Sequence, residues 1–267
     1  MKSKLLLMIL VIGGGLSAHA ALTVDFSNMG NIDPVSLTST QSVTVAVGDV
    51  VVIASGTNKR PSVSTMTASS TSGETFYSVN TWTDGTTPNP APWMSYAVIT
   101  TAGTFDFVTK SAGSASTVNS LYHLSSDLGS VAFLDGDEQI YSGLAGDAVL
   151  SLTNSLSWAA DANYGDSVVI GVSSHLRAMN NDTVNLVYNN GSAQRSTGAS
   201  NLVAGVTSYD VEWTFQNNDA TGRTSGGAVL SGVFTEVVPE PATVGMLGLG
   251  GLLTVLARRM KNTYRRF

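Results

Sequence analysis

Two stretches with the same pattern decide the fold of this chain: residues 47–58, VGDVVVIASGTN, and residues 164–175, YGDSVVIGVSSH. Each carries Gly-Asp, then a run of Val and Ile, then small polar residues. Gly-Asp is a natural tight turn into a strand, and an unbroken β-branched run is typical of a central strand buried on both faces. The echo predicts two equivalent strands in two halves of one sandwich, although chance in a β-rich sequence explains it nearly as well.

Short β-favouring runs separated by Gly, Asn, Asp and Ser clusters recur throughout residues 21–237, where helical periodicity is hard to find. The clearest predicted strands are 42–47, 50–55, 75–82, 93–100, 104–109, 117–124, 167–173, 183–188, 210–215 and 228–235. Many short strands with regular turn signals predict an all-β, β-sandwich or jelly-roll-like domain over residues 21–237.

The first 20 residues have the three parts of a secretory signal peptide. Lys2 and Lys4 precede an apolar run over 5–16, and Ala18 and Ala20 are the small residues that signal peptidase recognises. The sequence therefore predicts cleavage after Ala20. The alternative, an N-terminal membrane anchor, is disfavoured because the run is shorter than the about 20 apolar residues that a span needs.

Composition excludes several kinds of site in the exported part. The chain has no cysteine, which excludes Cys nucleophiles, Cys-ligated zinc and iron–sulfur clusters. Seven of its 13 Lys and Arg lie in the signal peptide and the C-terminal tail, so residues 21–237 carry six bases against 18 acids, a net charge of −12. Because nucleic-acid binding depends on Lys and Arg that neutralise phosphates, no nucleic-acid partner is expected.

Candidate catalytic and metal-binding residues are few. The acidic run 135–138, Asp-Gly-Asp-Glu, is typical of a solvated hairpin loop, although such oxygens could also hold Ca²⁺. His123 and His175 lie on predicted strands and lack the spacing of zinc ligands. A glycoside hydrolase needs two carboxylates flanking one bond, and no motif selects a pair. We therefore expect no catalytic residue, metal or cofactor, and a non-enzymatic protein.

Aromatic residues leave a second hypothesis open. The segment 81–93, TWTDGTTPNPAPW, contains three prolines that disfavour regular strand pairing, so Trp82 and Trp93 could contact sugars from an exposed loop. The competing interpretation is that both rings belong to the core, where strand tryptophans usually lie, or pack within the loop. If the first interpretation holds, the domain is a carbohydrate-binding module. Asn181 and Asn190 match the N-x-S/T pattern, which leaves glycosylation open.

The C-terminus, residues 238–267, is built differently. Val-Pro-Glu-Pro at 238–241 precedes 16 uncharged residues, 242–257, which as a helix would span about 24 Å. A basic tail over 258–267 follows, beginning with Arg258, Arg259 and Lys261. The positive-inside rule places that tail in the cytoplasm. We therefore expect one transmembrane helix with the ectodomain outside the inner membrane.

This order of motif, span and basic cluster resembles the PEP-CTERM sorting signal of Gram-negative bacteria. The resemblance implies that Pro239, Glu240 and Pro241 are the recognition motif of an exosortase, an integral-membrane processing enzyme. It further implies transient anchoring in the inner membrane, then a cell-surface or extracellular-matrix location linked to exopolysaccharide and biofilm. The tail over 260–267 is longer than usual in such signals. The competing interpretation is a plain single-pass anchor.

Three functional hypotheses follow from the sequence. The first is an exosortase-sorted, non-enzymatic surface or matrix protein. The second is a carbohydrate-binding module for matrix polysaccharide, and the third is a secreted glycoside hydrolase.

Overall fold

The computed structural model describes residues 21–32, 38–57, 66–79, 92–111, 117–127, 129–146, 148–175, 179–192, 195–217, 221 and 223–238. Every regular element in these residues is a β-strand, and each strand pairing between them is antiparallel. The predicted all-β class is therefore confirmed. The expected signal peptide, sorting motif, transmembrane helix and basic tail lie outside the described residues. In the described part of the chain, no helix is long and apolar enough to cross a membrane.

The strands divide into two sets of eight along the chain. The first set is β1 (Leu22–Ile32), β2 (Thr38–Val45), β3 (Val50–Thr57), β4 (Met66–Ser70), β5 (Tyr77–Ser78), β6 (Trp93–Val98), β7 (Gly103–Ser111) and β8 (Thr117–Ser126). The second set is β9 (Ser130–Leu144), β10 (Val149–Ser157), β11 (Tyr164–His175), β12 (Met179–Val184), β13 (Val187–Ser192), β14 (Arg195–Leu202), β15 (Ser208–Asn217) and β16 (Ser225–Val237).

Each set forms a two-sheet sandwich with the same topology. In the N-terminal sandwich, the inner sheet has the order β1-β8-β3-β6-β5 and the outer sheet β2-β7-β4. The C-terminal sandwich has β9-β16-β11-β14-β13 and β10-β15-β12. Adding eight to every strand number of the first half thus gives the second half. Most consecutive strands alternate between the two sheets, as they do in a jelly roll, so the region contains a duplicated, jelly-roll-like unit.

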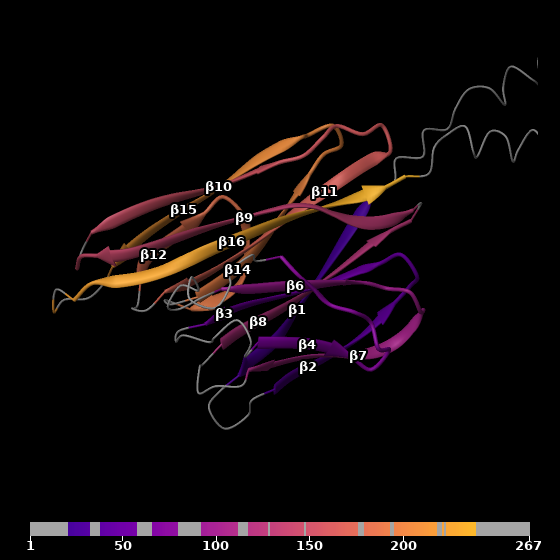
Figure 1. Cartoon of the computed structure of the whole chain (residues 1–267), viewed down its shortest axis with the longest axis horizontal. Helices are drawn as coiled ribbons and strands as arrows, with labels where there is room; N and C mark the ends of the chain where they lie inside the picture. The colour runs from indigo at the N-terminus through magenta and orange to yellow at the C-terminus, as the bar shows by residue number, and fades with distance from the viewer. Residues whose placement is uncertain are drawn as a thin grey trace, which may run out of the picture.

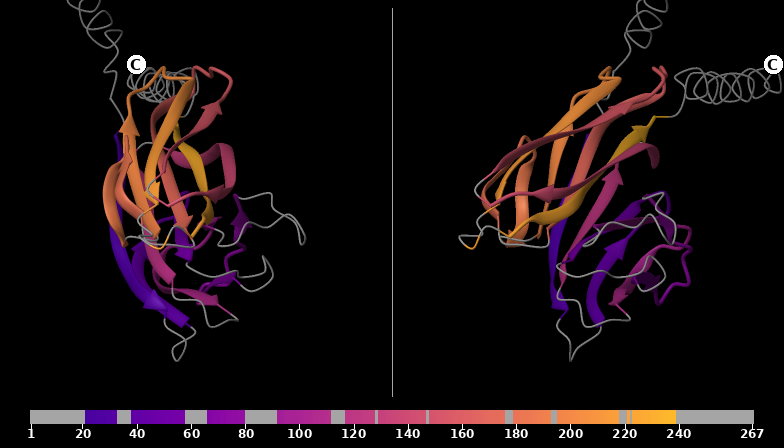
Figure 2. Two further views of the ribbon diagram at one scale, coloured as in Figure 1. Left: turned by 90° about the vertical axis from the view of Figure 1, so that its left-hand side faces the viewer. Right: turned by 60° about the vertical axis from the view of Figure 1, so that its left-hand side comes forward.

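The two inner sheets pack against each other, which gives four layers of sheet and three cores (Figures 1 and 2). A central core lies between the inner sheets and includes Val52 and Tyr122 from one sandwich and Ile170 and Phe234 from the other. Each sandwich also has its own core between its inner and outer sheets. The packing between the sandwiches is therefore largely apolar, and it also contains a buried hydrogen bond between Ser120 of β8 and Thr197 of β14.

The two stretches with the shared pattern are the middle strands of the inner sheets, β3 and β11. Val50 and Val52 enter the central core while Val51 enters the N-terminal core, and all three are fully buried. The prediction of two equivalent central strands, buried on both faces, is confirmed. They belong to two packed sandwiches instead of two halves of one, because each half forms its own outer sheet.

The residue-by-residue match between the stretches is shifted by one position. Aligned by letters, Val51 corresponds to Val168, but Val51 lies in the N-terminal core and Val168 in the central core. The register of β11 against β16 is irregular between Tyr164 and Ser167. Three steps on β11, from Tyr164 to Ser167, face two on β16, so the stretch at Gly165 and Asp166 contains one extra residue and Val168 is equivalent to Val50. Because side chains alternate between faces, a slip of one residue exchanges the two faces of a strand.

Candidate functional sites: a histidine–aspartate cluster and an aromatic seam

The turn between β2 and β3 joins three parts of the molecule. Gly48 has a φ of +94°, in the left-handed region that favours glycine. Its N–H donates to the Ile99 carbonyl at 2.9 Å, and its carbonyl accepts from the Val131 N–H at 3.0 Å. The Ile99 N–H donates to the Asp49 carbonyl at 2.9 Å. The turn therefore connects the segment after β6 with β9, the first strand of the other sandwich.

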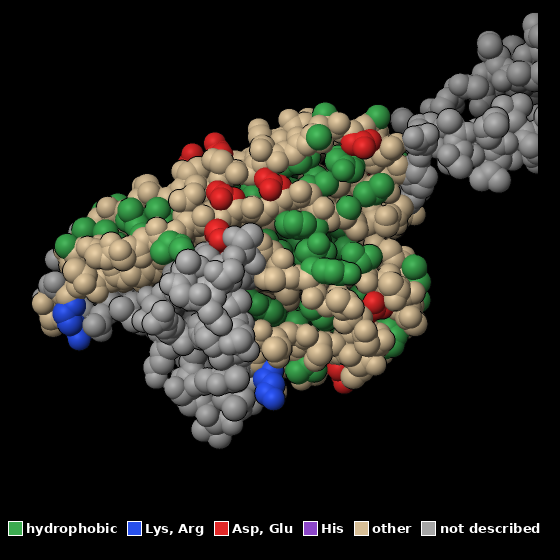
Figure 3. All heavy atoms as spheres, viewed as in Figure 1, with side chains coloured by type: hydrophobic (Ala, Val, Ile, Leu, Met, Phe, Trp, Pro, Cys, Tyr) green, Lys and Arg blue, Asp and Glu red, His purple; other side chains and the backbone are tan. Residues whose placement is uncertain are grey.

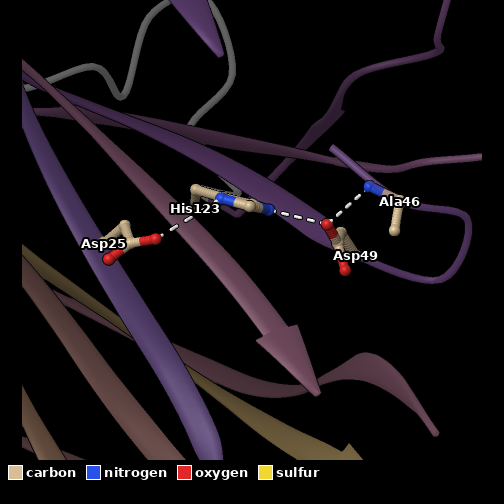
Figure 4. A network of polar contacts seen from close by, with 4 residues as sticks. All are labelled: Asp25, Ala46, Asp49 and His123. Atoms are coloured by element: carbon tan, nitrogen blue, oxygen red, sulfur yellow. Dashed lines mark hydrogen bonds and ion pairs between the residues drawn. The ribbon is translucent and has the colours of Figure 1, made fainter. Parts of the chain in front are cut away.

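Asp49 uses the same turn to hold a histidine. Its buried carboxylate accepts from the Ala46 N–H at 2.8 Å and from Nε2 of His123 at 2.7 Å (Figure 4). His123 lies on β8 and faces Asp25 of β1, whose Oδ2 is 3.9 Å from Nδ1. Because a carboxylate only accepts, Nε2 carries the ring hydrogen. The cluster thus orders an imidazole between one buried and one exposed aspartate.

The chemistry that this cluster can perform is limited by where its atoms point. A general base needs a free nitrogen within hydrogen-bond reach of a proton that it removes. Nε2 of His123 is bound to Asp49, and Nδ1 faces Asp25, which is 72% exposed and screened by solvent. Within the described ranges, no group of three or more His, Asp or Glu side chains could hold a metal ion. The cluster therefore fits a structural tie between β8 and the Gly48–Asp49 turn.

The second histidine is fully buried and held neutral. His175, at the end of β11, bonds through Nδ1 to the Tyr141 hydroxyl at 2.6 Å and lies 4.2 Å from the Phe215 ring, measured between centroids. Burial lowers the pKa of His175 to about 3 because an apolar surrounding disfavours the charged ring. Both histidines lie on strands, as predicted, and they occupy different sandwiches.

The acidic run 135–138 lies within the 15-residue strand β9, so the prediction of a solvated hairpin loop was wrong. Asp135 accepts from the Ser157 N–H at 2.8 Å, and Asp137 accepts from the Ser155 N–H at 2.9 Å. Both donors belong to the edge strand β10. The carboxylates therefore satisfy backbone groups of an edge strand that has no further strand beside it. Side-chain bonds of this kind close the open edge between two sheets.

Trp93 does not offer a flat face to solvent. It is 7% exposed and packs in the N-terminal core, where its ring fills the space between the inner and outer sheets. Trp93 is therefore a core residue, and the prediction that it contacts sugars from an exposed loop was wrong. Trp82 lies outside the described residues, as do Ala18, Ala20, Pro239, Glu240, Pro241, Arg258, Arg259 and Lys261.

A partly exposed aromatic cluster occurs elsewhere, at the seam between the sandwiches. Tyr77 of β5 and Tyr96 of β6 face each other across the strand pair, with ring centroids 5.5 Å apart. Tyr96 stacks on Phe133 of β9 at 5.0 Å, and Phe234 of β16 contacts both of these rings. Figure 3 shows hydrophobic side chains gathered where the two sandwiches meet. We refer to these four rings as the aromatic seam.

Sequence reasoning missed this seam because no single strand contains it. The four rings come from four strands, and two of the four contacts, those of Tyr96 with Phe133 and Phe234, join one sandwich to the other. Alternation along β6 places Trp93 on one face and Tyr96 on the other. The sequence gives that alternation but does not reveal which face meets a second sheet.

The last described strand, β16, runs directly up to the sorting signal. Val237 pairs with Tyr164 and Ser130, and the Val238 N–H donates to the Asn163 carbonyl at 2.7 Å. Residues 237–261 match the PEP-CTERM protein-sorting motif. The chain carries a PEP-CTERM sorting signal. The motif implies an exported, membrane-sorted protein that an exosortase processes, which confirms the resemblance seen in the sequence.

The other comparisons add no function. No curated protein matches the chain. Among solved structures, it is similar to PNGase F, a glycosylasparaginase from Flavobacterium meningosepticum, at 12% identity and a TM-score of 0.30, over 82% of this chain and 96% of that one. An anti-sigma factor domain-containing protein has 9% identity and a TM-score of 0.20, over 76% and 82%. Similarities this weak do not support an argument about activity.

Proposed function

We propose that the protein is a non-enzymatic component of the cell surface or extracellular matrix of a Gram-negative bacterium, delivered by an exosortase and associated with exopolysaccharide. The observation that carries the proposal is the direct junction between β16 and the motif. Val237 and Val238 are hydrogen-bonded into the inner sheet of the C-terminal sandwich, and the matched motif begins at residue 237. Processing beyond this junction would release the whole duplicated domain in its folded form.

The polar clusters support a structural role over a catalytic one. Asp49 and His123 hold a turn that joins the sandwiches, and Asp135 and Asp137 cap an edge strand. These carboxylates are therefore already engaged by protein donors. Asp25 and Asp49 are separated by the His123 ring, which is not the arrangement of two carboxylates facing one glycosidic bond.

The sorting proposal is tested by the mass of the protein at its destination. We expect intact-mass analysis of cell-surface material to find a form that begins at Ala21 and lacks most of residues 242–267. Substitution of Glu240 by Ala should leave the unprocessed form in the inner membrane, whereas substitution of Asn262 by Ala, in the basic tail, should not. Recovery of residues 21–267 as the sole species in wild-type cells would refute processing.

A carbohydrate-binding module is the second candidate function, and the aromatic seam favours it. Rings at the surface of a rigid sheet are suitable for stacking against sugars, and Tyr77 is 53% exposed. This candidate is compatible with the first, because a matrix protein can be retained by the polysaccharide around it.

A further inference from the structure

The aromatic seam is a continuous ladder of rings that begins in the central core and ends in solvent. Phe234 is fully buried and lies 5.4 Å from Phe133 and 5.6 Å from Tyr96. Tyr96 and Phe133 are half-buried and nearly parallel, with an angle of 25° between their planes. Tyr77 is the outermost ring and is 53% exposed. Each ring is thus supported from behind by the next one.

This support fixes the exposed ring before any ligand arrives. Tyr77 belongs to β5, an edge strand of two residues that is held to β6 in register with Tyr96. Close contact continues at the end of β5, where a Cβ on Gly136 of β9 would lie 2.9 Å from Cγ1 of Val79. The seam is therefore closed by direct packing of the two sandwiches. A ring that is already ordered loses little conformational entropy on binding.

The seam also presents polar groups beside its apolar faces. Tyr77 and Tyr96 each carry a hydroxyl that can donate and accept a hydrogen bond. Tyrosine hydroxyls keep their hydrogen at neutral pH, and burial and the neighbouring Tyr77 raise the pKa of Tyr96 further. A flat ring with adjacent hydroxyls matches a pyranose sugar, which has an apolar face of C–H groups and a rim of hydroxyls.

Charge distinguishes between kinds of polysaccharide. The strand that contributes Phe133 also carries Asp135, Asp137 and Glu138, and residues 21–237 have a net charge of −12. A polymer of uronic acids carries negatively charged carboxylates, which this acidic surface would repel. Such a polymer is therefore disfavoured as a ligand. A neutral polymer stacks on the rings without that penalty.

We propose that Tyr77, supported by Tyr96 and Phe133, is the contact surface for a neutral, pyranose-based polysaccharide. The inference rests on the proposed matrix association and names the residues that make the contact. It places the binding surface at the junction of the two sandwiches, so both halves are needed to hold the rings in place.

Affinity gel electrophoresis of the full-length chain tests this proposal. The chain is kept in a polyoxyethylene detergent, since a sugar-headed detergent would compete. The gels contain hydroxyethyl cellulose or dextran as neutral probes and alginate as the anionic probe. We expect retardation by at least one neutral probe, with at least a fivefold weaker apparent affinity for Tyr77→Ala. Tyr77→Phe keeps the ring and should stay within about threefold of wild type.

The matched control is Phe26→Ala, because Phe26 is an exposed ring, at 37%, on the other edge strand of the same sheet. It should bind as wild type does. A thermal melt equal to that of wild type shows that Tyr77→Ala is folded; if it is not, Tyr77→Ser and Tyr77→Lys carry the same test. The proposal is overturned by no retardation in either neutral probe, by retardation in alginate alone, or by unchanged binding of Tyr77→Ala. If Tyr77→Ala is still processed and delivered as wild type is, a failure to bind polysaccharide overturns this inference alone and leaves the proposed sorting function intact.

Discussion

Acidification should destabilise the fold through His175. Its pKa is lowered to about 3 in the folded protein by burial, against about 6.5 in an unfolded chain. Between these values the unfolded chain binds a proton that the folded protein does not. Stability therefore rises with pH across this window and is lost as pH falls from about 6.5 towards 3. The slope for one proton is about 1.4 kcal/mol per pH unit.

Integrating that slope gives a loss of about 2 kcal/mol at pH 5, and about 4 kcal/mol near pH 3 if the protein is still folded. The matched variant is His175→Asn, which keeps a polar group near Nδ1 for the Tyr141 hydroxyl but does not titrate. Urea unfolding at pH 7.5 and pH 5.0 measures both proteins. The carboxylates and His123 are common to the two, so the difference isolates His175.

We expect wild type to lose about 2 kcal/mol more than His175→Asn over that interval, whatever the two stabilities are at pH 7.5. His123 and His175 are the two histidines of residues 21–267, so proton NMR of a chain that begins at Ala21 resolves them. Parallel pH dependence of the two proteins, or an imidazole titration near 6.5 for His175, would refute the reasoning.

Three further predictions concern the duplicated domain. Asp49→Asn should lower the free energy of unfolding by about 1–3 kcal/mol because it weakens the buried, charge-assisted bond to His123. Asp25→Asn should change the free energy of unfolding by less than about 0.5 kcal/mol. Chemical denaturation of the two variants measures both values. Gly48→Ala should cost about 1–3 kcal/mol through its φ of +94°, and an unchanged melting temperature would contradict this. Gly171→Ala should cost about 1–3 kcal/mol through overpacking, since the new Cβ would lie 2.8 Å from the Trp213 ring; a melting curve identical to that of wild type would argue against this packing.

Central strands could be predicted well from the sequence, whereas edge strands could not. The Val and Ile runs of β3 and β11 were readable because strands buried on both faces need no alternation. β9 was missed because Asp-Gly-Asp-Glu reads as a turn, and only its position beside β10 explains why those carboxylates belong in a strand. The predicted strand 183–188 covers the end of β12 and the start of β13, with a bend between them. Its alternating Val and Leu continue through the turn and conceal it.

The candidate sites also differ in how far the sequence reveals them. The sorting signal is linear, so its residues could be read directly, and residues 237–261 match it. The His123–Asp49 bond joins residues 74 positions apart, and the aromatic seam joins four strands from two sandwiches. Contacts of this kind depend on the strand order and on which sheet faces meet. The duplicated topology likewise becomes visible only when the strand orders of the two sandwiches are compared. The similar stretches marked the equivalent strands but were misaligned by the extra residue between Tyr164 and Ser167.

The junction between β16 and the sorting motif also determines how the domain bears mechanical load. β16 lies between β9 and β11, and its antiparallel bonds run perpendicular to the strand. A pull on the C-terminus, while the chain is still attached to the membrane, acts along β16 and shears these bonds together instead of opening them one at a time. Because Val237 and Val238 are already bonded, the pull reaches the paired strand at its last residues. A load on the C-terminus would therefore be carried by the most extensively paired of the described strands.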